Sequence, residues 1–237
     1  MAEPGIDAVQ QIRRWHIYAS TDELENYAAG AVRRAAKQAI EAYGGFNLVL
    51  AGGNTPRGVY ARLAAAPSDW GHWHIYFGDE RCRPQGDAAR NDRMAREAWL
   101  GRVPIPPAQI RSIPAEMGAV EAARRYAQIL APLEQFDLVL LGIGADGHTA
   151  SLFPGRSLDG AEVLAVLDAP KPPPERVSLS AARLSRARQV MFVVSGEAKR
   201  GAIAAWRRGD SIPAAAVAPP AGVDILLDVS AWPECCV

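Results

Sequence analysis

The apolar residues near the start of the chain follow a helical period. Ser20 and Glu23 have the spacing of a capping box, which marks the beginning of a helix. Apolar residues then recur every three or four positions from Leu24 to Ala39, and Gly44 ends the pattern. The sequence therefore predicts a long amphipathic helix in this region.

Short, continuous apolar runs follow, and they are typical of strands that are buried on both faces of a parallel sheet. The predicted strands are 46–51, 73–77, 136–141, 189–194 and 224–227, and the predicted helices are 56–65, 90–100, 119–130 and 196–208. For the first of these helices we expect Thr55 as N-cap and Pro56 at the first position. Alternating strands and helices imply right-handed parallel crossovers. We therefore predict an α/β fold with a doubly wound, mostly parallel sheet and helices on both faces.

The two proline-rich stretches of the chain, 103–107 and 169–174, are predicted to be surface loops. Neither is long enough to separate two domains, and 237 residues are not too many for one α/β unit. We therefore expect residues 1–237 to form a single domain.

Charge and hydropathy exclude several classes of protein. The chain has 26 Lys and Arg against 26 Asp and Glu, so a broad basic surface for nucleic acid is not expected. No apolar run approaches the roughly 20 residues that cross a membrane. Residues 1–11 include Glu3 and Asp7 and lack the features of a secretion signal, so we expect a cytoplasmic protein.

Ligands of such sheets bind beyond the carboxyl ends of the strands, where this chain has unusual loops. The first loop, Gly52-Gly53-Asn54-Thr55, joins a predicted strand to a helix N-terminus. Glycines allow close approach of a ligand, and free N–H groups with the helix dipole favour an anion such as phosphate. The alternative is a tight turn with an N-cap and no ligand.

Two further strand ends carry charged residues. The loop 78–84 contains Asp79 and Arg81, and Arg81 is suited to a phosphate or carboxylate; the alternative is a solvated turn. Lys199 falls in the predicted first turn of helix 196–208, where a cation is unfavourable unless an anion is near. Lys199 is therefore another candidate phosphate ligand, or else an exposed surface lysine.

The segment 142–154 is the most specific of these loops. It places His148 two residues after Asp146 within a glycine-rich stretch that follows an apolar strand. A histidine of near-neutral pKa can take a proton from water, and a neighbouring carboxylate can orient it. We predict that His148 and Asp146 are catalytic.

With these loops, the sequence resembles the 6-phosphogluconolactonase family, whose fold group includes glucosamine-6-phosphate deaminase and ribose-5-phosphate isomerase. The resemblance covers the chain from Leu50 to about Asp228. It rests on the segments 51–56, 77–81, 141–154, 174–177 and 196–199.

The resemblance implies hydrolysis of 6-phospho-D-glucono-1,5-lactone to 6-phospho-D-gluconate in the oxidative pentose phosphate pathway, without metal or cofactor. His148 would be the general base and Asp146 would position it. The implied substrate-binding residues are Gly52, Gly53, Asn54, Thr55, Asp79, Arg81, Gly144, Gly147, Arg176 and Lys199, with Arg176 on the sugar side. Gly144 and Gly147 are included because N–H groups of the glycine loop can donate to an oxyanion.

The chain departs from the family at two places. Asn54 stands where members usually have Ser, and Arg90-Asn91 replaces a Ser-Asn pair. Arg90 either adds positive charge near the site or faces solvent.

Two alternative functions are a glucosamine-6-phosphate deaminase-like isomerase and a non-catalytic sugar-phosphate-binding module. Deaminases follow the histidine with a Phe-Asn-Glu-Pro type segment, whereas this chain has Ser151-Leu152-Phe153-Pro154. The expected partner is a small phosphosugar lactone, with no nucleic acid and no membrane. We expect a monomer or a small homo-oligomer.

Overall fold

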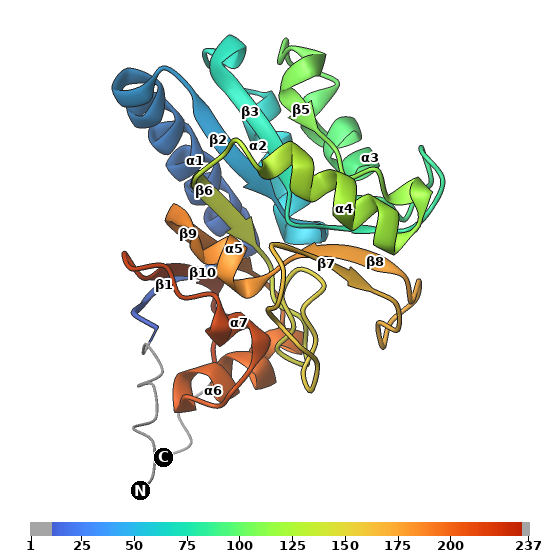
Figure 1. The fold of residues 1–237 in the computed structure, drawn as a ribbon. Helices are drawn as coiled ribbons and strands as arrows, with labels where there is room; N and C mark the ends of the chain where they lie inside the picture. The colour runs from blue at the N-terminus through green and yellow to red at the C-terminus, as the bar shows by residue number, and fades with distance from the viewer. Residues whose placement is uncertain (1–10, 234–237) are drawn as a thin grey trace, which may run out of the picture.

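The fold is centred on one twisted parallel sheet (Figure 1). The computed structural model describes residues 11–233, so Glu3 and Asp7 lie outside the described residues. Seven strands pair in the order β1-β10-β9-β6-β2-β3-β5, and every pair is parallel. Their bounds are β1 Arg13–Tyr18, β2 Phe46–Leu50, β3 Trp73–Phe77, β5 Ile110–Arg111, β6 Phe136–Leu141, β9 Ala187–Val194 and β10 Val223–Asp228.

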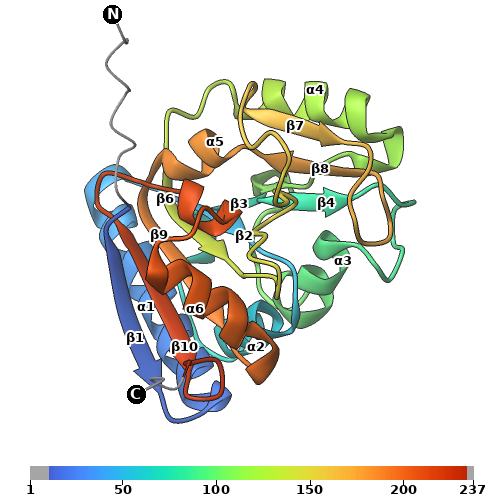
Figure 2. The same ribbon diagram turned by 90° about the horizontal axis from the view of Figure 1, so that it is seen from below.

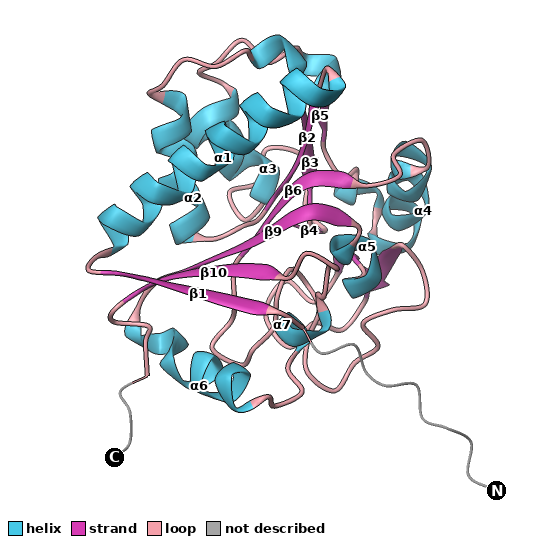
Figure 3. Cartoon of the chain, turned by 90° about the vertical axis from the view of Figure 1, so that its left-hand side faces the viewer, coloured by secondary structure: helices cyan, strands magenta, loops and turns pink. Residues whose placement is uncertain are grey.

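Helices cover both faces of this sheet, with α1 and α2 on one side and α6 on the other (Figure 3). The helices are α1 Thr21–Tyr43, α2 Asn54–Ala64, α3 Asn91–Ala95, α4 Ala119–Leu130, α5 Ala181–Ser185, α6 Arg200–Arg208 and α7 Pro213–Ala216. Single turns are η1 Trp70–His72, η2 Arg96–Leu100, η3 Pro107–Gln109, η4 Ala115–Met117 and η5 Glu197–Lys199. The predicted α/β class and doubly wound sheet are confirmed.

A second, three-stranded antiparallel sheet lies beside the first, next to α4 (Figure 2). It pairs β4 Asp79–Arg81 with β8 Arg176–Leu179, and β8 with β7 Val163–Val166. Strands of three or four residues show no readable hydrophobic period, and the sequence analysis did not predict them.

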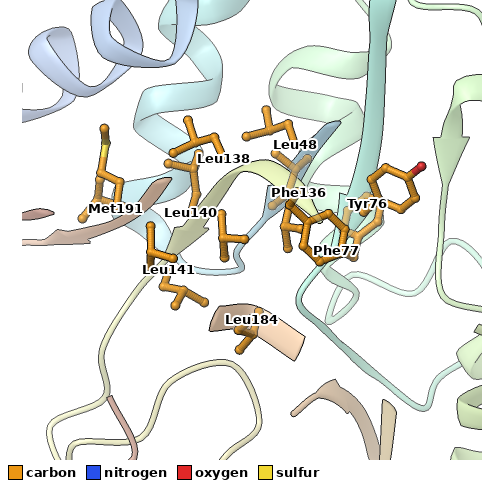
Figure 4. Close-up of a cluster of buried hydrophobic side chains, with 14 of the residues drawn as sticks. Leu48, Tyr76, Phe77, Phe136, Leu138, Leu140, Leu141, Leu184 and Met191 are labelled. Carbon is orange, nitrogen blue, oxygen red and sulfur yellow. The ribbon is translucent and has the colours of Figure 1, made fainter. Parts of the chain in front are cut away.

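The central strand β6 explains the continuous apolar runs in the sequence. All six of its residues are buried, and large side chains of β2, β3 and β9 pack around it (Figure 4). The one charged side chain in the strand, Asp137, accepts hydrogen bonds from the Asn47 backbone N–H at 2.8 Å and from Arg188 Nε at 3.2 Å. The strand ends that carry the loops are therefore held by a close-packed platform.

Two of the predicted helix starts differ from the structure. Ser20 caps α1 as expected, since its Oγ accepts from the Glu23 N–H at 3.2 Å. The N-cap of α2, however, is Gly53 and not Thr55. Gly53 has φ of 109°, a conformation open essentially to glycine alone, and the helix begins two residues earlier than predicted. Lys199 lies in turn η5, just ahead of α6, and not in the first turn of that helix.

Candidate active site

Four neighbouring strands end at one cavity of about 220 Å³. These are β9, β6, β2 and β3, which are adjacent in the sheet, and the loop that follows each of them lines the cavity. The predicted site residues that line it are Gly52, Gly53, Asn54, Thr55, Asp79, Arg81, Gly144, His148, Arg176 and Lys199. Residues 146 and 147 are not among the lining residues. Loops from distant parts of the sequence thus meet at the position expected for a ligand of this fold.

The loop between β2 and α2 presents a helix N-terminus to the cavity. Gly53 makes no side-chain cap, so the first N–H groups of α2 are not used by a capping side chain. The hydroxyl of Thr55 contacts the Ser195 hydroxyl at 2.8 Å, across from the end of β9. This arrangement suits an anion, because unpaired N–H groups and the helix dipole both favour negative charge.

The turn after β6 holds His148 against Asp146. The imidazole Nδ1 is hydrogen-bonded to Asp146 Oδ1, and a Cβ on residue 144 would lie 1.9 Å from that nitrogen. Only glycine at 144 therefore leaves room for the ring. Asp146 is outside the cavity lining, behind the imidazole.

The N–H groups of Gly144 and Gly147 are both used inside this turn. Gly144 donates to the His148 carbonyl at 2.7 Å, and Gly147 donates to the Gly144 carbonyl at 3.0 Å. The expectation that these two N–H groups meet the substrate is therefore corrected. Gly147 instead packs against Ile212, and its φ of 82° allows the turn.

The surroundings of His148 and Asp146 shift the pKa of both groups downward. Burial lowers the pKa of His148, and the nearby Lys171 adds to this effect, although the hydrogen bond to Asp146 opposes it. Partial burial raises the pKa of Asp146, but the hydrogen bond and charge of His148 outweigh it and lower that pKa to about 2. With Nδ1 bonded to a carboxylate, the proton sits on Nδ1 and the lone pair on Nε2. Nε2 has no hydrogen-bond partner among the described residues.

Lys171 is a cavity residue that the sequence analysis missed. Its Nζ lies 3.4 Å from His148 Nδ1 and 3.4 Å from Asp146 Oδ2. It belongs to the proline-rich loop 169–174, which was predicted only as a surface loop. The one signal in the sequence is that Lys171 lies five residues before Arg176, a predicted site residue. In the structure, Arg176 donates to the Lys171 carbonyl at 2.9 Å and fixes the loop.

Arg81 and Arg176 are direct cross-strand partners on β4 and β8. Like charges at such positions repel each other, so the pair is unfavourable unless an anion is bound. Burial and the charge of Arg81 both lower the pKa of Arg176. Arg81 donates to the Ala89 carbonyl at 2.6 Å, while its Nε is buried without a partner among the described residues. Both arginines are among the residues that line the cavity.

Lys199 reaches the same cavity from turn η5. Burial lowers its pKa, and the charge of Lys171 lowers it further. The two ammonium groups therefore lie close enough to repel each other, which again favours a bound anion.

Asp79 is buried in the wall of the cavity, and both oxygens of its carboxylate accept hydrogen bonds from neighbouring side chains. Ser151 Oγ donates to Asp79 Oδ2 at 2.7 Å, and Asn91 Nδ2 donates to Oδ1 at 3.1 Å. Asn91 itself lines the cavity, which the sequence analysis did not predict.

The expectation that Arg90 faces solvent is wrong. Its side chain is 1% exposed, so it does not face solvent, and it does not line the cavity. It pairs with Asp92 at 2.9 Å and Glu116 at 2.9 Å, behind α3. Arg90 thus holds loops together instead of meeting the substrate.

Between residues 11 and 233, no three His, Cys, Asp or Glu side chains are arranged to hold a metal ion. Within the same residues, none of the helices combines the length and apolar character of a membrane span.

The fold of this chain matches solved structures of sugar-phosphate enzymes. The structure of 6-phosphogluconolactonase from Thermotoga maritima matches with a TM-score of 0.86 and 25% identity, over 92% of this chain and 100% of that one. A monomeric glucosamine-6-phosphate deaminase shares the fold, with a TM-score of 0.80 and 21% identity over 92% of this chain and 98% of its own.

Sequence comparison identifies the family. Residues 19–226 match the family described as glucosamine-6-phosphate isomerases/6-phosphogluconolactonase, and the chain belongs to this family. Among its relatives is the 6-phosphogluconolactonase of Mycobacterium leprae, 37% identical over 202 residues, which cover 78% of this chain and 80% of the relative. The predicted family resemblance is confirmed.

Proposed function

We propose that this chain hydrolyses 6-phospho-D-glucono-1,5-lactone to 6-phospho-D-gluconate in the oxidative pentose phosphate pathway, with His148 as general base. Family membership and the relatives named 6-phosphogluconolactonase support lactone hydrolysis. The observation that carries the mechanism is that His148 and the open N-terminus of α2 line one cavity. An imidazole base and an anion-binding loop can therefore act on two ends of one substrate.

In the proposed reaction, Nε2 of His148 takes a proton from a water molecule as the water oxygen attacks the lactone carbonyl carbon. The resulting tetrahedral intermediate collapses with cleavage of the bond between that carbon and the ring oxygen. The imidazolium returns its proton to the departing ring oxygen, and the product is an open-chain carboxylic acid. Asp146 keeps the ring in the tautomer that leaves Nε2 free and stabilises the transient positive charge.

The phosphate is proposed to bind at the N-terminus of α2, between the N–H groups of residues 53–55 and the cations Lys199 and Arg81. Anchoring a dianion away from the reacting carbonyl orients that carbonyl toward the base. The cationic wall also balances negative charge that develops on the carbonyl oxygen. Arg176, held by carbonyl groups of residues 171–173, is proposed to line the sugar side.

The deaminase alternative is disfavoured by the segment that follows His148. Ser151 bonds Asp79 and Phe153 packs against the imidazole with ring centroids 4.8 Å apart, so no carboxylate occupies this position. A non-catalytic sugar-phosphate-binding module would bind the product without accelerating hydrolysis. A rate measurement separates these possibilities.

The test uses lactone generated in situ from glucose 6-phosphate, because the lactone also hydrolyses spontaneously. Its disappearance is followed with and without the protein, and with the protein in the presence of chelator. We expect a clear acceleration that chelator leaves unchanged. An unaccelerated rate would refute lactonase activity, and a rate abolished by chelator would refute the metal-free mechanism.

We propose that the protein acts in the cytoplasm as a monomer or a small homo-oligomer. Cell fractionation and sedimentation of the purified protein would test these two expectations.

A further inference from the structure

Asn91 is a buried amide at the start of α3 that lines the cavity. Its backbone N–H donates to Glu80 Oε1 at 2.8 Å, so the backbone at this position is fixed. Its side-chain Nδ2 donates to the carbonyl of Asp79 at 2.9 Å and to the carboxylate Oδ1 of Asp79 at 3.1 Å. Both hydrogen atoms of the amide nitrogen are therefore used.

The orientation of this amide follows from its neighbours. Both groups that contact one end of the amide are acceptors, so the nitrogen and not the oxygen must face Asp79. The oxygen then points to Gly52, where a Cβ would lie 2.1 Å from it. The absence of a side chain at residue 52 leaves room for the amide oxygen at the cavity wall. This oxygen accepts no hydrogen bond from the described residues.

The remaining polar groups of the cavity are mainly donors, from Arg81, Lys171, Arg176 and Lys199. Each carboxylate oxygen of Asp79 already accepts one hydrogen bond, from Ser151 or from Asn91. Asn91 Oδ1 is thus a rigidly held acceptor in a wall of donors. Phosphate and carbonyl groups of a substrate carry no proton for such an acceptor at neutral pH, whereas sugar hydroxyl groups do.

We propose that Asn91 is a specificity-determining residue whose amide oxygen accepts a hydrogen bond from a sugar hydroxyl group, at C2, C3 or C4, that the lactone and its open-chain product share. The inference rests on the proposed function, since it assumes a polyhydroxylated sugar phosphate in this cavity. An analogue that lacks the hydroxyl leaves a buried acceptor unpaired, which costs roughly 1–3 kcal/mol, or about 5- to 150-fold in affinity. Asn91 therefore selects a hydroxylated sugar lactone over its deoxy counterpart.

The test is a double-mutant cycle between residue 91 and the ligand. Binding of 6-phosphogluconate and of its 2-, 3- and 4-deoxy analogues is measured by calorimetry for the wild type, for Asn91→Ala and for Asn91→Ser. Asn91 is the first residue of α3, where a small polar residue is well tolerated, so the second variant preserves the fold if alanine does not. We expect the wild type to bind one analogue about 5- to 150-fold more weakly than 6-phosphogluconate, and we expect this difference to shrink to under about threefold in both variants.

Inorganic phosphate serves as the control ligand, because it reports on the anion site without any sugar hydroxyl group. Its affinity should be unchanged in both variants. The proposal is overturned if the variants keep the wild-type discrimination, or if they lose phosphate binding as strongly as 6-phosphogluconate binding. If the wild type accelerates lactone hydrolysis but binds all three deoxy analogues as tightly as 6-phosphogluconate, this inference alone is overturned. A wild type that binds no 6-phosphogluconate would overturn the proposed function as well.

Discussion

Two charged clusters of the molecule use their hydrogen-bonding capacity to different extents. Behind α3, Arg90 is 1% exposed and bonds two carboxylates, of Asp92 and Glu116, and the carbonyl groups of Arg83 and Ile113. All five of its N–H groups have partners. In the cavity, His148 has one nitrogen bonded to Asp146, and the other has no partner among the described residues.

The comparison shows how charged residues that only stabilise the fold differ from those that can take part in a reaction. Glu80, next to Arg90, accepts from the backbone N–H groups of residues 81, 91 and 92 and thereby fixes the start of α3. Burial raises its pKa even though these hydrogen bonds oppose the effect. A cluster with every donor and acceptor used can only hold the chain together, whereas a cluster with one unused nitrogen in a cavity can take a proton. Three predictions test this distinction.

The largest expected effect is on catalysis. His148→Ala removes the proposed base and should lower kcat by about 10²- to 10⁴-fold, while 6-phosphogluconate still binds and the protein stays folded. The matched control is His72→Ala, which changes a half-exposed histidine at the opposite end of β3. Rates of lactone disappearance and calorimetric binding check both variants. A His148→Ala protein with a normal rate would remove this residue from the mechanism.

The next effect is on stability. Arg90→Met removes the buried cation that pairs with the fully buried Glu80 and with Asp92 and Glu116, and it should reduce the free energy of unfolding by about 3–5 kcal/mol. Arg93→Met on the same helix is the control, because Arg93 forms an exposed pair with Glu97 and should cost under about 1 kcal/mol. Urea unfolding of the three proteins measures the difference. Equal stability of the two variants would contradict the structural role of the Arg90 cluster.

The smallest effect is on pH dependence. The value of kcat/KM should rise with pH as His148 loses its proton and then level off, and burial places that pKa below the ordinary value of 6.5. The charged groups that face the ring are Asp146 and Asp79, which raise its pKa, and Lys171, which lowers it. Lys171→Met removes the positive charge, so the pKa of His148 rises and the acid limb moves to higher pH.

The plateau rate of Lys171→Met should change less than about fivefold, because half-exposed charge interactions are worth at most about 1 kcal/mol. Lys37→Met, an exposed change on α1, is the control and should leave the profile in place. NMR titration of His148 in the free protein reads the same shift without substrate. An unmoved titration in Lys171→Met would show that this lysine does not act on the imidazole.

The large elements of the fold could be predicted because their signals are local. The capping box at Ser20 and the apolar runs of β2, β3, β6, β9 and β10 each report on residues that are neighbours in the sequence. The short strands β4, β7 and β8 carry no such signal because each has only three or four residues, and β4 pairs with a strand about 100 residues away in the sequence. The start of α2 was misplaced because the backbone conformation of Gly53 outweighs the capping preference of Thr55.

The same limit applies to the site. Asp146 and His148 are two residues apart in one turn, so their contact could be expected from the sequence alone. Lys171 and Asn91 enter the cavity only because other residues fix their loops, Arg176 for the first and Glu80 for the second. The role of Arg90 could not be read either, because a sequence does not show which side of a short helix will be buried.

The two arginines of the cavity wall face each other across a ladder of only three residue pairs, between β4 and β8. Side chains alternate between the faces of a strand, so sliding one strand by a single residue would turn one guanidinium away from the ligand. An insertion or deletion within residues 176–179 would therefore alter the anions that this protein accepts, without any substitution at α2 or His148. A change in strand register can therefore alter the substrate specificity of such a fold, just as a substitution of a pocket residue can.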